Sequence, residues 1–252
     1  MYEIKYEYDI DKGEEAVVEA YRSALRIIEE LGAEDFTIRI TRKSHTIHIQ
    51  CWKLWLPIDE PLFGTGPVPG WLSESDKLAI THLSSLLPMS GVLVEVGSFL
   101  GKSSVEWANN FKNLNKNYEI ISIDHYNLPI TNIHKLLTDS DYPIPPGQDQ
   151  LELFKYYTKD YKNIIPLQAL FNNQFRFFRK VNLVFEDSDH EISTLNHGLP
   201  FWWDLLLPGG ILAGHDWDLP QVRQVVSTFA ICNNLEVKQL FDSKIWFIQK
   251  DN

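Results

Sequence analysis

The sequence has few cysteines, few positive charges and no long apolar run, and each of these shortages excludes or disfavours a class of protein. Cys51 and Cys232 are the only two cysteines in 252 residues, and neither belongs to a metal-type spacing. This argues against a disulfide scaffold and a cysteine-rich metal site, and it favours a reducing, cytoplasmic setting. No stretch approaches the roughly 18 apolar residues of a membrane span, so we expect a soluble protein without a membrane partner.

Positive charge is also scarce. The chain has 23 lysines and arginines against 34 aspartates and glutamates, which gives a formal net charge of −11. Because clustered lysines and arginines bind phosphate backbones, we expect no nucleic-acid partner. What the chain does have is 44% hydrophobic and 13% aromatic residues, the composition of a packed globular protein.

The first 57 residues look like a small unit of their own. Alternating apolar side chains predict a strand over 2–8, and helical spacing predicts a helix over 13–31. Two further alternating runs, 36–40 and 46–50, are joined by the polar residues 41–45 and predict a hairpin. We therefore expect a β-α-β-β unit, which covers the site of the larger domain, mediates homo-oligomer contacts or only supports packing.

A stretch rich in proline and glycine follows this unit. Residues 57–70 contain four prolines and three glycines, the composition of a linker. The predicted organisation is therefore an N-terminal unit over 1–57, a linker over 58–70 and a larger domain over 71–252.

The larger domain shows the pattern of an α/β fold. It opens with a helix at about 74–87, where Ser73 and Asp76 form a capping-box pair. Short apolar runs then alternate with helical stretches, which indicates a parallel sheet covered by helices on both faces. The expected strands are 92–96, 119–123, 164–167, 181–185 and 211–213. After the first of them we expect a helix that ends at about 112, and further helices near 149–161, 200–207 and 220–232.

The C-terminal end departs from this alternation. Residues 235–241 and 244–248 both look like strands, and only Asp242 and Ser243 separate them. A parallel crossover needs about a dozen residues, so these two strands must run antiparallel to each other. We therefore expect a mostly parallel sheet that closes with an antiparallel hairpin.

The connection over 126–149 is longer than an ordinary strand-to-helix loop. Long ordered loops in compact domains often cover active sites. We expect such a cover here, with a short helix near 131–137.

The most informative segment is the glycine turn after the first strand of the larger domain. Gly97 follows a buried strand, and Gly101 lies just before a helix. Glycines at such a turn let the backbone approach a ligand, while the start of the helix offers free N–H groups. A phosphate-binding P-loop needs four residues between its glycines and this turn has three, and a dinucleotide turn needs a glycine where Phe99 stands.

S-adenosylmethionine (SAM) fits this turn better than a nucleotide does. SAM has an amino-acid end and a ribose but no phosphate. Glu95 on the strand would accept from its ammonium group, and Asp124, 27 residues after Gly97, would accept from the two ribose hydroxyls. The alternative is a turn used for packing, with Asp124 as a helix cap.

Acidic residues and histidines follow two later strands. The strand over 181–185 leads into Glu186-Asp-Ser-Asp-His190, and the strand over 211–213 leads into Gly214-His-Asp216. Because ligands bind at the carboxyl ends of the strands in such a sheet, both groups should meet at one mouth. The first hypothesis is a divalent cation such as Mg²⁺ held by Asp187, His215 and Asp216. The second is a general base, His190 or His215, with a pKa near neutrality and with Asp189 orienting it, and the third is a set of loop and helix caps.

Taken together, these motifs resemble one family. Glu95-Val-Gly97, Gly101-Lys-Ser-Ser104, Asp124, Asp187-Ser-Asp-His190, the run from Pro208 to Asp216 and the closing hairpin look like class I SAM-dependent methyltransferases, over roughly residues 70–250. The resemblance implies a Rossmann-like, mostly parallel seven-stranded α/β sheet, with SAM across its first two strands and the acceptor near the fourth and fifth. The chain is also distantly similar to catechol-type O-methyltransferases, but His215-Asp216 replaces their Asp-Asn pair. The residues that the resemblance and the turn place at the cofactor are Glu95, Gly97, Ser98, Gly101, Lys102, Ser103, Asp124, His125, Gln168 and Asp187.

The sequence thus predicts an enzyme, a SAM-dependent methyltransferase that acts on a hydroxyl of a small-molecule acceptor. Two alternatives stay open: a catalytically degenerate protein of the same fold that only binds a ligand or partner, and a P-loop-type nucleotide-binding enzyme. The residues expected to take part in catalysis are His190, His215 and Asp189.

Overall fold

The chain divides into two compact units. The computed structural model describes residues 2–7, 36–43, 46–53, 68–136, 149–172 and 175–251. One unit consists of Met1–Trp55 with Asn172–Phe178, and the other of Leu56–Phe171 with Arg179–Asn252. The sequence pattern gives no sign that the segment Asn172–Phe178 groups with the N-terminal unit.

The N-terminal unit contains a three-stranded antiparallel sheet. Its strands are β1 (Tyr2–Glu7), β2 (Phe36–Lys43) and β3 (Thr46–Lys53), with β3 in the centre. The alternation in the sequence predicts all three strands, but β2 extends through residues 41–43, which were expected in the joint of the hairpin. The helix predicted over 13–31 lies outside the described residues.

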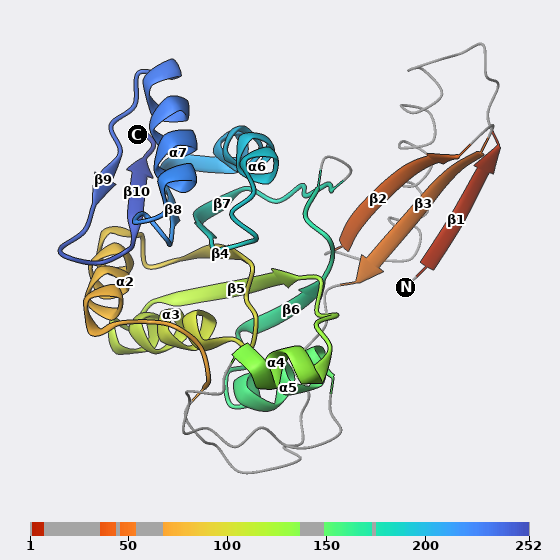
Figure 1. Ribbon diagram of the computed structural model, residues 1–252, viewed down its shortest axis with the longest axis horizontal. Coiled ribbons are helices and arrows are strands. Elements are labelled where there is room, and N and C mark those ends of the chain that lie inside the picture. The colour runs from red at the N-terminus through yellow and green to blue at the C-terminus, as the bar shows by residue number, and fades with distance from the viewer. Residues whose placement is uncertain are drawn as a thin grey trace. The chain divides into compact units, whose positions relative to one another are not determined.

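The larger unit is built on a seven-stranded mixed sheet, and this confirms the predicted fold class (Figure 1). The strand order is β6-β5-β4-β7-β8-β10-β9, and β10 runs antiparallel to both β8 and β9. The predicted closing hairpin is therefore present, although β9 is only two residues long. The strands are β4 (Ser90–Val96), β5 (Asn117–Asp124), β6 (Ile164–Gln168), β7 (Val181–Glu186), β8 (Leu206–Gly214), β9 (Lys238–Gln239) and β10 (Trp246–Gln249).

Helices cover both faces of this sheet. Leu93 and Phe185 point to the face whose core includes α2, α3 and α5, whereas their neighbours Val94 and Val184 are buried on the opposite face. Figure 1 shows α6 and α7 on the side of the sheet opposite to α2 and α3. The helices are α2 (Glu74–Leu86), α3 (Lys102–Asn113), α4 (Ile130–Leu136), α5 (Gln150–Thr158), α6 (Ile192–Leu205) and α7 (Pro220–Cys232).

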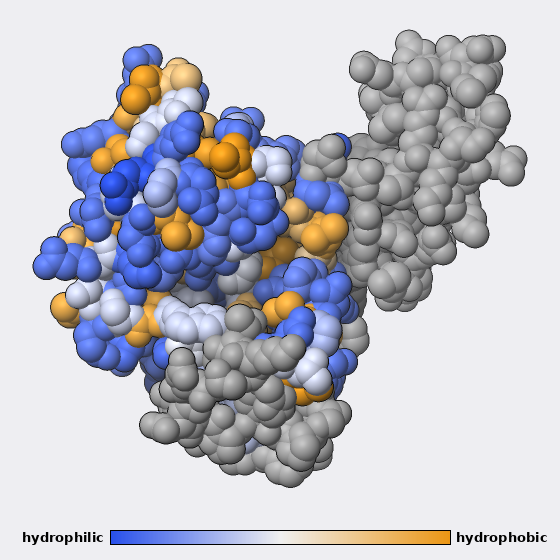
Figure 2. Space-filling view, viewed as in Figure 1, coloured by the Kyte–Doolittle hydropathy of each residue, from blue (hydrophilic) through white to orange (hydrophobic). Residues whose placement is uncertain are grey.

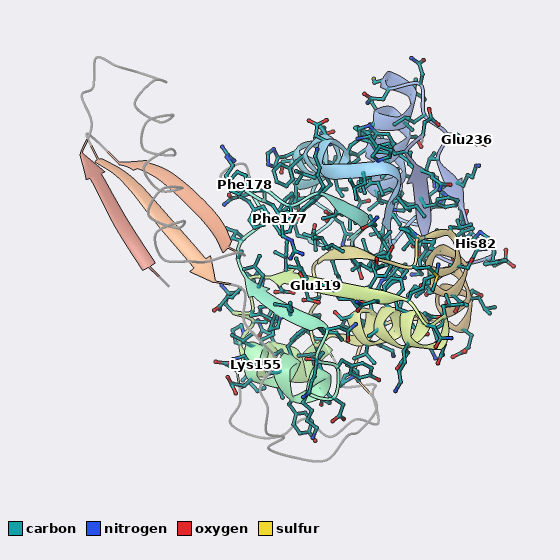
Figure 3. The ribbon with its side chains drawn as sticks, turned by 180° about the vertical axis from the view of Figure 1, so that it is seen from behind. His82, Glu119, Lys155, Phe177, Phe178 and Glu236 are labelled. Carbon is teal, nitrogen blue, oxygen red and sulfur yellow. The ribbon has the colours of Figure 1, made fainter. Side chains whose placement is uncertain are left out.

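Helix α2 begins with the predicted capping box and packs beside the C-terminal strands. The Ser73 hydroxyl accepts from the Asp76 N–H, and the Asp76 carboxylate accepts from the Ser73 N–H. Further along the helix lies His82, which is labelled in Figure 3. Its ring makes an edge contact with that of Phe241, at 6.1 Å between ring centroids. The start of α2 lies beside the chain that leads into β10, because the Asp76 carboxylate accepts from the Lys244 N–H at 2.9 Å.

One predicted element is misplaced. The sequence suggested a helix near 200–207, but α6 begins at Ile192 and ends at Leu205, with Pro200 inside it. Residues 206–207 belong to β8 instead, because Pro208 disfavours a helical conformation of the residue before it. The short helix predicted near 131–137 is present as α4, and the rest of the predicted cover, residues 137–148, lies outside the described ranges.

The surface seen in Figure 2 is mostly hydrophilic. Apolar residues on this face form small, separate groups. Within the ranges that the structure describes, no helix is long and apolar enough to cross a bilayer.

Candidate functional site

A cavity of about 790 Å³ lies at the carboxyl ends of β4, β5, β7 and β8. The chain runs from β4 to β5 and β6 on one side and crosses to β7 on the other, so the strand order reverses beside β4. Such a reversal leaves a crevice where α/β folds bind ligands. The cavity is lined by Gly70, Trp71, Leu72, Ser73, Asp76, Val96, Gly97, Phe99, Ile123, Asp124, His125, Leu128, Ala169, Leu170, Phe171, Asp187, Ser188, Asp189, His190, Thr194, His215, Asp216 and Lys244.

Gly97 sits where the ends of β4 and β7 come closest. Its φ is +85°, a left-handed conformation that favours glycine. A Cβ at this position would overlap the carbonyl oxygen of Asp187 and lie 2.8 Å from the Cα of Ser188. The glycine is therefore required by the approach of the β7 loop as well as by any ligand in the cavity.

Gly97→Ala is expected to lower the free energy of unfolding by about 3 kcal/mol, from the left-handed φ and the overlap together. Urea unfolding of both proteins measures the difference. A loss of less than about 1 kcal/mol, no more than a left-handed residue costs by itself, would contradict the role of the β4–β7 approach.

Gly101 has a different role from the one that the sequence suggested. Its φ is +91°, and a Cβ there would lie 2.7 Å from Cγ2 of Thr158 and 3.0 Å from the ring of Phe154. Both neighbours belong to α5, and Gly101 is not among the residues that line the cavity. Close packing of α5, rather than contact with a ligand, explains this glycine.

Asp124 ends β5 and faces the cavity. Oδ2 accepts from the Phe99 N–H at 2.9 Å, and Oδ1 accepts from the Tyr126 N–H at 2.9 Å. The buried amide of Gln150 donates to Oδ1 at 3.4 Å, and Nδ1 of His125 lies 3.3 Å from the same oxygen. Burial raises the pKa of Asp124, while the two backbone N–H groups oppose that rise. The side chain is thus fixed and presents a carboxylate to the cavity.

The start of α3 lines a second, small cavity of about 50 Å³ next to the large one. Ser98, Lys102 and Ser103 all border it. The Lys102 ammonium donates to the carbonyl oxygen of Gly70 at 2.6 Å, and burial lowers its pKa. These three predicted residues therefore gather at the helix start, beside the large cavity.

Two other predicted residues lie at the β5–β6 edge. His125 lines the large cavity. Gln168 does not, and its side-chain amide donates to the His125 carbonyl oxygen at 3.1 Å. Gln168 therefore supports the chain at His125 in this structure.

Glu95 lies behind the glycine turn and outside the cavity. It is fully buried, and Oε2 accepts from the hydroxyl of Ser104 and, at 3.5 Å, from that of Ser122. Within the described residues Oε1 has no hydrogen-bond partner. Burial raises the pKa of Glu95 to about 7, although the hydroxyls of Ser103 and Ser104 oppose that rise. The sequence suggested that Glu95 contacts the ligand. In the structure Glu95 does not line the cavity.

Glu95→Gln is expected to flatten the fall in stability with rising pH. A carboxyl with a raised pKa binds more protons in the folded state, so its contribution is present below about pH 4.5 and is lost towards pH 7. Glu186, whose pKa burial also raises to about 7, keeps part of this slope. Thermal unfolding from pH 4.5 to pH 8 tests this, with Glu74→Gln on the surface of α2 as control. A wild-type slope in Glu95→Gln would count against it.

His190 lies between two carboxylates at the far end of the cavity from Asp124. Its Nε2 is 2.7 Å from Oδ2 of Asp216 and 3.8 Å from Oδ1 of Asp187. His190 and Asp216 both have left-handed backbones, with φ of +59° and +57°. Non-glycine residues hold such conformations only where their surroundings fix them, and functional sites are where they gather.

The charges of this cluster differ from the sequence-based expectation of a near-neutral histidine. The carboxylates of Asp187 and Asp216 raise the pKa of His190 to about 10. Burial would lower the pKa of His215, but the carboxylates of Asp216 and Asp76 outweigh it and raise that pKa to about 10 as well. Both imidazoles therefore carry a proton at neutral pH while no cation is bound, so neither acts as a general base in that state.

The same cluster suits a divalent cation. One ligand atom from each of Asp187, His190 and Asp216 lies within 4.8 Å of the others. Two carboxylates and an imidazole are common ligands of Mn²⁺ or Fe²⁺, and the carboxylates suit Mg²⁺. A cation bound by His190 would displace its proton, because an imidazole nitrogen binds a metal ion only when it is unprotonated. The sequence suggested His215, rather than His190, as the third ligand of the cation. In the structure the group that could hold a cation contains His190, and the Nε2 of His215 lies 3.4 Å from Asp76.

Asp189 does not orient a histidine. Its Oδ1 accepts from the Glu191 N–H at 3.0 Å, and its Oδ2 accepts from the Thr194 hydroxyl at 3.2 Å. These contacts support the start of α6, so Asp216 is the carboxylate that faces His190 most closely. Asp189 still lines the cavity.

Sequence reasoning missed several residues of the cavity. Asp76 was identified only as a helix cap, yet it also contacts His215 and lines the cavity. Trp71 and Phe99 stack with ring centroids 5.5 Å apart at the wall of the cavity. The signals available were a tryptophan directly after the linker and an aromatic residue inside the glycine turn.

Comparison with known proteins gives one match by sequence and several by structure. Residues 94–217 match the family model of a methyltransferase domain. No curated protein matches the chain. The O-methyltransferase NovP superposes with a TM-score of 0.51 and 12% identity, over 71% of this chain and 80% of NovP. The precorrin 8w decarboxylase of Methanobacterium thermoautotrophicum gives a TM-score of 0.50 and 13% identity, over 79% of this chain and 100% of the decarboxylase.

The two kinds of match carry different weight. At such low identity the structural likenesses support the fold alone. The family match runs from β4 to the turn after β8, and it includes the glycine turn, Asp124 and the cluster of Asp187, His190 and Asp216.

Proposed function

Since residues 94–217 of this chain form a methyltransferase domain of the class I, SAM-dependent family, we propose that the protein methylates a hydroxyl of a small molecule. The observation that carries this proposal is the single cavity that joins Asp124 to the cluster of Asp187, His190 and Asp216. One end of it suits the cofactor, and the other end suits an acceptor. Methyl transfer is a direct displacement, so alignment of the two is most of what the protein must supply.

The residues around Asp124 fit SAM, which supplies a methyl group on a sulfonium when bound. A carboxylate offers about four acceptor positions, and the N–H groups of Phe99 and Tyr126 and the amide of Gln150 use three of them on Asp124. One ribose hydroxyl would take the fourth position, and a second would replace the Gln150 amide, which is the longest of the three contacts at 3.4 Å. The turn at Gly97 and Phe99 would lie along the ligand, and the start of α3 would face its amino-acid end. His125 would flank the ribose at the end of β5.

The cluster at the other end would hold the acceptor hydroxyl. Asp187 and Asp216 are the carboxylates closest to it, and protonated His190 keeps them in place while no cation is bound. A divalent cation such as Mg²⁺ would be held by Asp187, Asp216 and His190, and it would supply a lower pKa to a bound hydroxyl. The mixed lining, aromatic at Trp71 and charged at this cluster, suits a small polar molecule better than a polymer.

The alternatives fit the site less well. In a P-loop the lysine reaches phosphates, whereas Lys102 donates to the Gly70 carbonyl oxygen at 2.6 Å. A degenerate binding protein would have no need for two carboxylates held beside an imidazole at the acceptor end of the cavity. The methyltransferase proposal accounts for both features.

The setting of the enzyme is part of the same proposal. The scarcity of cysteine supports a reducing, cytoplasmic compartment, and the negative charge supports a small-molecule acceptor over a nucleic acid. We also keep the division into residues 1–57, a linker over 58–70 and a domain over 71–252, with the N-terminal unit as the contact for a homo-oligomer.

Release of S-adenosylhomocysteine tests the proposed function. The protein is incubated with SAM and a panel of small hydroxyl compounds, with Mg²⁺ or with a chelator, and the product is quantified. Acceptor-dependent release supports the proposal, and its loss with the chelator supports the cation. Binding of SAM without release from any acceptor would favour the degenerate protein, and magnesium-dependent release of phosphate from ATP would favour the P-loop enzyme.

A further inference from the structure

Asp76 makes more contacts than a helix cap requires. It is only 2% exposed, and its Oδ2 accepts from the N–H and the hydroxyl of Ser73, at 2.8 and 2.7 Å. Its Oδ1 accepts from the N–H of Lys244 at 2.9 Å, a residue 168 positions away in the chain. The Asp76 carboxylate thus ties the start of α2 to the chain just before β10.

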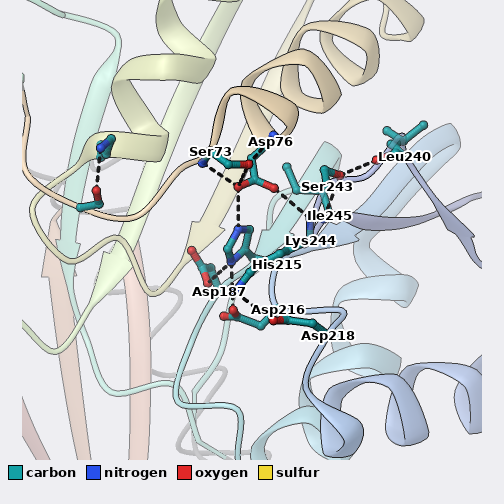
Figure 4. A network of polar contacts seen from close by, with 12 residues as sticks. Ser73, Asp76, Asp187, His215, Asp216, Asp218, Leu240, Ser243, Lys244 and Ile245 are labelled. Carbon is teal, nitrogen blue, oxygen red and sulfur yellow. Dashed lines mark hydrogen bonds and ion pairs between the residues drawn. The ribbon is translucent and has the colours of Figure 1, made fainter.

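One route from Asp76 to the acid–histidine cluster passes through His215. The Nε2 of His215 lies 3.4 Å from Oδ2 of Asp76, and its Nδ1 lies 3.3 Å from Oδ1 of Asp216 (Figure 4). The other oxygen of Asp216 lies 2.7 Å from Nε2 of His190. The four side chains therefore form a row in which carboxylates and imidazoles alternate, and Asp76 stands at its buried end.

A second route passes through the backbone of Lys244. Its N–H donates to Asp76, and its carbonyl oxygen accepts from the Trp217 N–H at 2.9 Å. Asp76 therefore reaches the residues on both sides of Asp216: His215 by its side chain, and Trp217 through the backbone of Lys244. Figure 4 shows this convergence of α2, the turn after β8 and the chain before β10.

The turn at Asp216 needs such support. Asp216 has a φ of +57°, which costs free energy in a residue other than glycine, so neighbouring contacts must hold it. The backbone of His215 is fixed from two further sides, because its N–H donates to the Glu186 carbonyl oxygen at 3.1 Å and its carbonyl oxygen accepts from the Trp246 indole at 3.1 Å. The His215 ring lies between two carboxylates, with Asp76 3.4 Å from Nε2 and Asp216 3.3 Å from Nδ1.

We propose that Asp76 is a positioning residue, which holds the ring of His215 and the turn after β8 so that Asp216 faces His190. Asp76 and Lys244 both lie outside the residues that the methyltransferase family model matches. The positioning of His215 and Asp216 by Asp76 depends on these side chains alone. The importance of this positioning for methyl transfer rests on the proposed function. Asp76 does not itself touch the reacting atoms in this assignment.

Histidine nuclear magnetic resonance of the full chain tests the proposal at one neutral pH. The ring ¹⁵N and ¹H resonances of His190 and His215 are assigned with His190→Gln and His215→Gln variants. In Asp76→Asn, which keeps the size of the side chain but loses the charge, both sets of resonances are expected to shift. His215→Gln should shift the His190 resonances too, with the cap of α2 intact.

Ser73→Ala is the matched control, because it weakens the same helix cap while the Asp76 carboxylate stays. It is expected to lower the melting temperature and to shift the resonances of both histidines much less than Asp76→Asn does. Unmoved His190 resonances in both Asp76→Asn and His215→Gln would overturn the proposal. Equal shifts in Ser73→Ala would overturn it as well, because the effect would then belong to the cap.

Binding of S-adenosylhomocysteine separates this inference from the proposed function. Asp124 and Asp76 line different ends of the cavity, so Asp76→Asn should bind the product within about threefold of the wild type. If the wild type fails to bind it while the histidine shifts appear as expected, the proposed function fails and the positioning role stands. If the product binds and the shifts do not appear, the positioning role fails alone.

Discussion

Replacing Asp216 by asparagine is expected to lower kcat/KM for methyl transfer about 1000-fold, within the range for loss of a group that handles the substrate's proton. Asp216 contacts His190 and His215, and its own pKa is lowered because these two imidazoles outweigh the effect of burial. Asparagine keeps the size of the side chain and tolerates the left-handed backbone at φ +57°. The loss should therefore come from the missing charge rather than from unfolding.

The control for this variant lies two residues further along. Asp218 pairs with the Lys244 ammonium at 2.9 Å, is about half exposed and does not line the cavity. Asp218→Asn should keep kcat/KM within about threefold of the wild type, as for a surface ion pair. The rates of S-adenosylhomocysteine release by the Asp216→Asn and Asp218→Asn variants are compared with that of the wild type. Equal losses, or an Asp216→Asn variant with more than a tenth of wild-type activity, would count against the assigned role.

Replacing Asp124 by alanine is expected to weaken the binding of SAM and S-adenosylhomocysteine about 100-fold. Two hydrogen bonds from ribose hydroxyls to a carboxylate are together worth about 3 kcal/mol, and 1.4 kcal/mol is about tenfold in Kd. Asp124→Asn keeps one acceptor oxygen and should fall between alanine and the wild type. Isothermal titration calorimetry with S-adenosylhomocysteine gives all three constants.

Two checks separate this effect from loss of structure. Asp124→Ala leaves the N–H groups of Phe99 and Tyr126 without an acceptor, so the melting temperature of the free protein is measured first and the titration is run well below it. Asp149→Asn, which removes the charge of the carboxylate that caps α5, should bind the product as the wild type does. Wild-type affinity in Asp124→Ala would remove Asp124 from the cofactor site.

The sequence predicted the sheet well because its signals are local. Continuous apolar runs predict the parallel strands, and the two-residue gap at Asp242 and Ser243 rules out a parallel crossover, as β9 and β10 confirm. Helix α6 was misplaced because its extent depends on tertiary packing, with Leu195 and Trp202 buried in the core. The grouping of 172–178 with the N-terminal unit left no mark in composition.

Residues of the candidate site were predictable only where they directly follow the carboxyl end of a predicted strand. Asp124 and Asp187 follow directly from their positions after β5 and β7. The direction in which a side chain points does not follow from position, and so Glu95 was expected in the cavity while it is buried behind the turn. The contact of Asp76 with His215 was not predicted, because it depends on how α2 packs beside β8.

Partners of histidines were the least predictable feature. Three candidate carboxylates lie within a few residues of His190 in the chain or across the sheet, and spacing alone cannot rank them. The structure turns Asp189 to Glu191 and Thr194 and leaves Asp216 for His190. The pKa of about 10 for His190 follows from that choice of partners.

The most direct test is calorimetric titration of the wild-type protein with S-adenosylhomocysteine, and separately with ATP plus magnesium and with NAD. Binding of S-adenosylhomocysteine at one site per chain, with no heat from the other two ligands, is the expected result. Binding of ATP in its place, or no binding of S-adenosylhomocysteine, would contradict the assignment of this cavity to SAM.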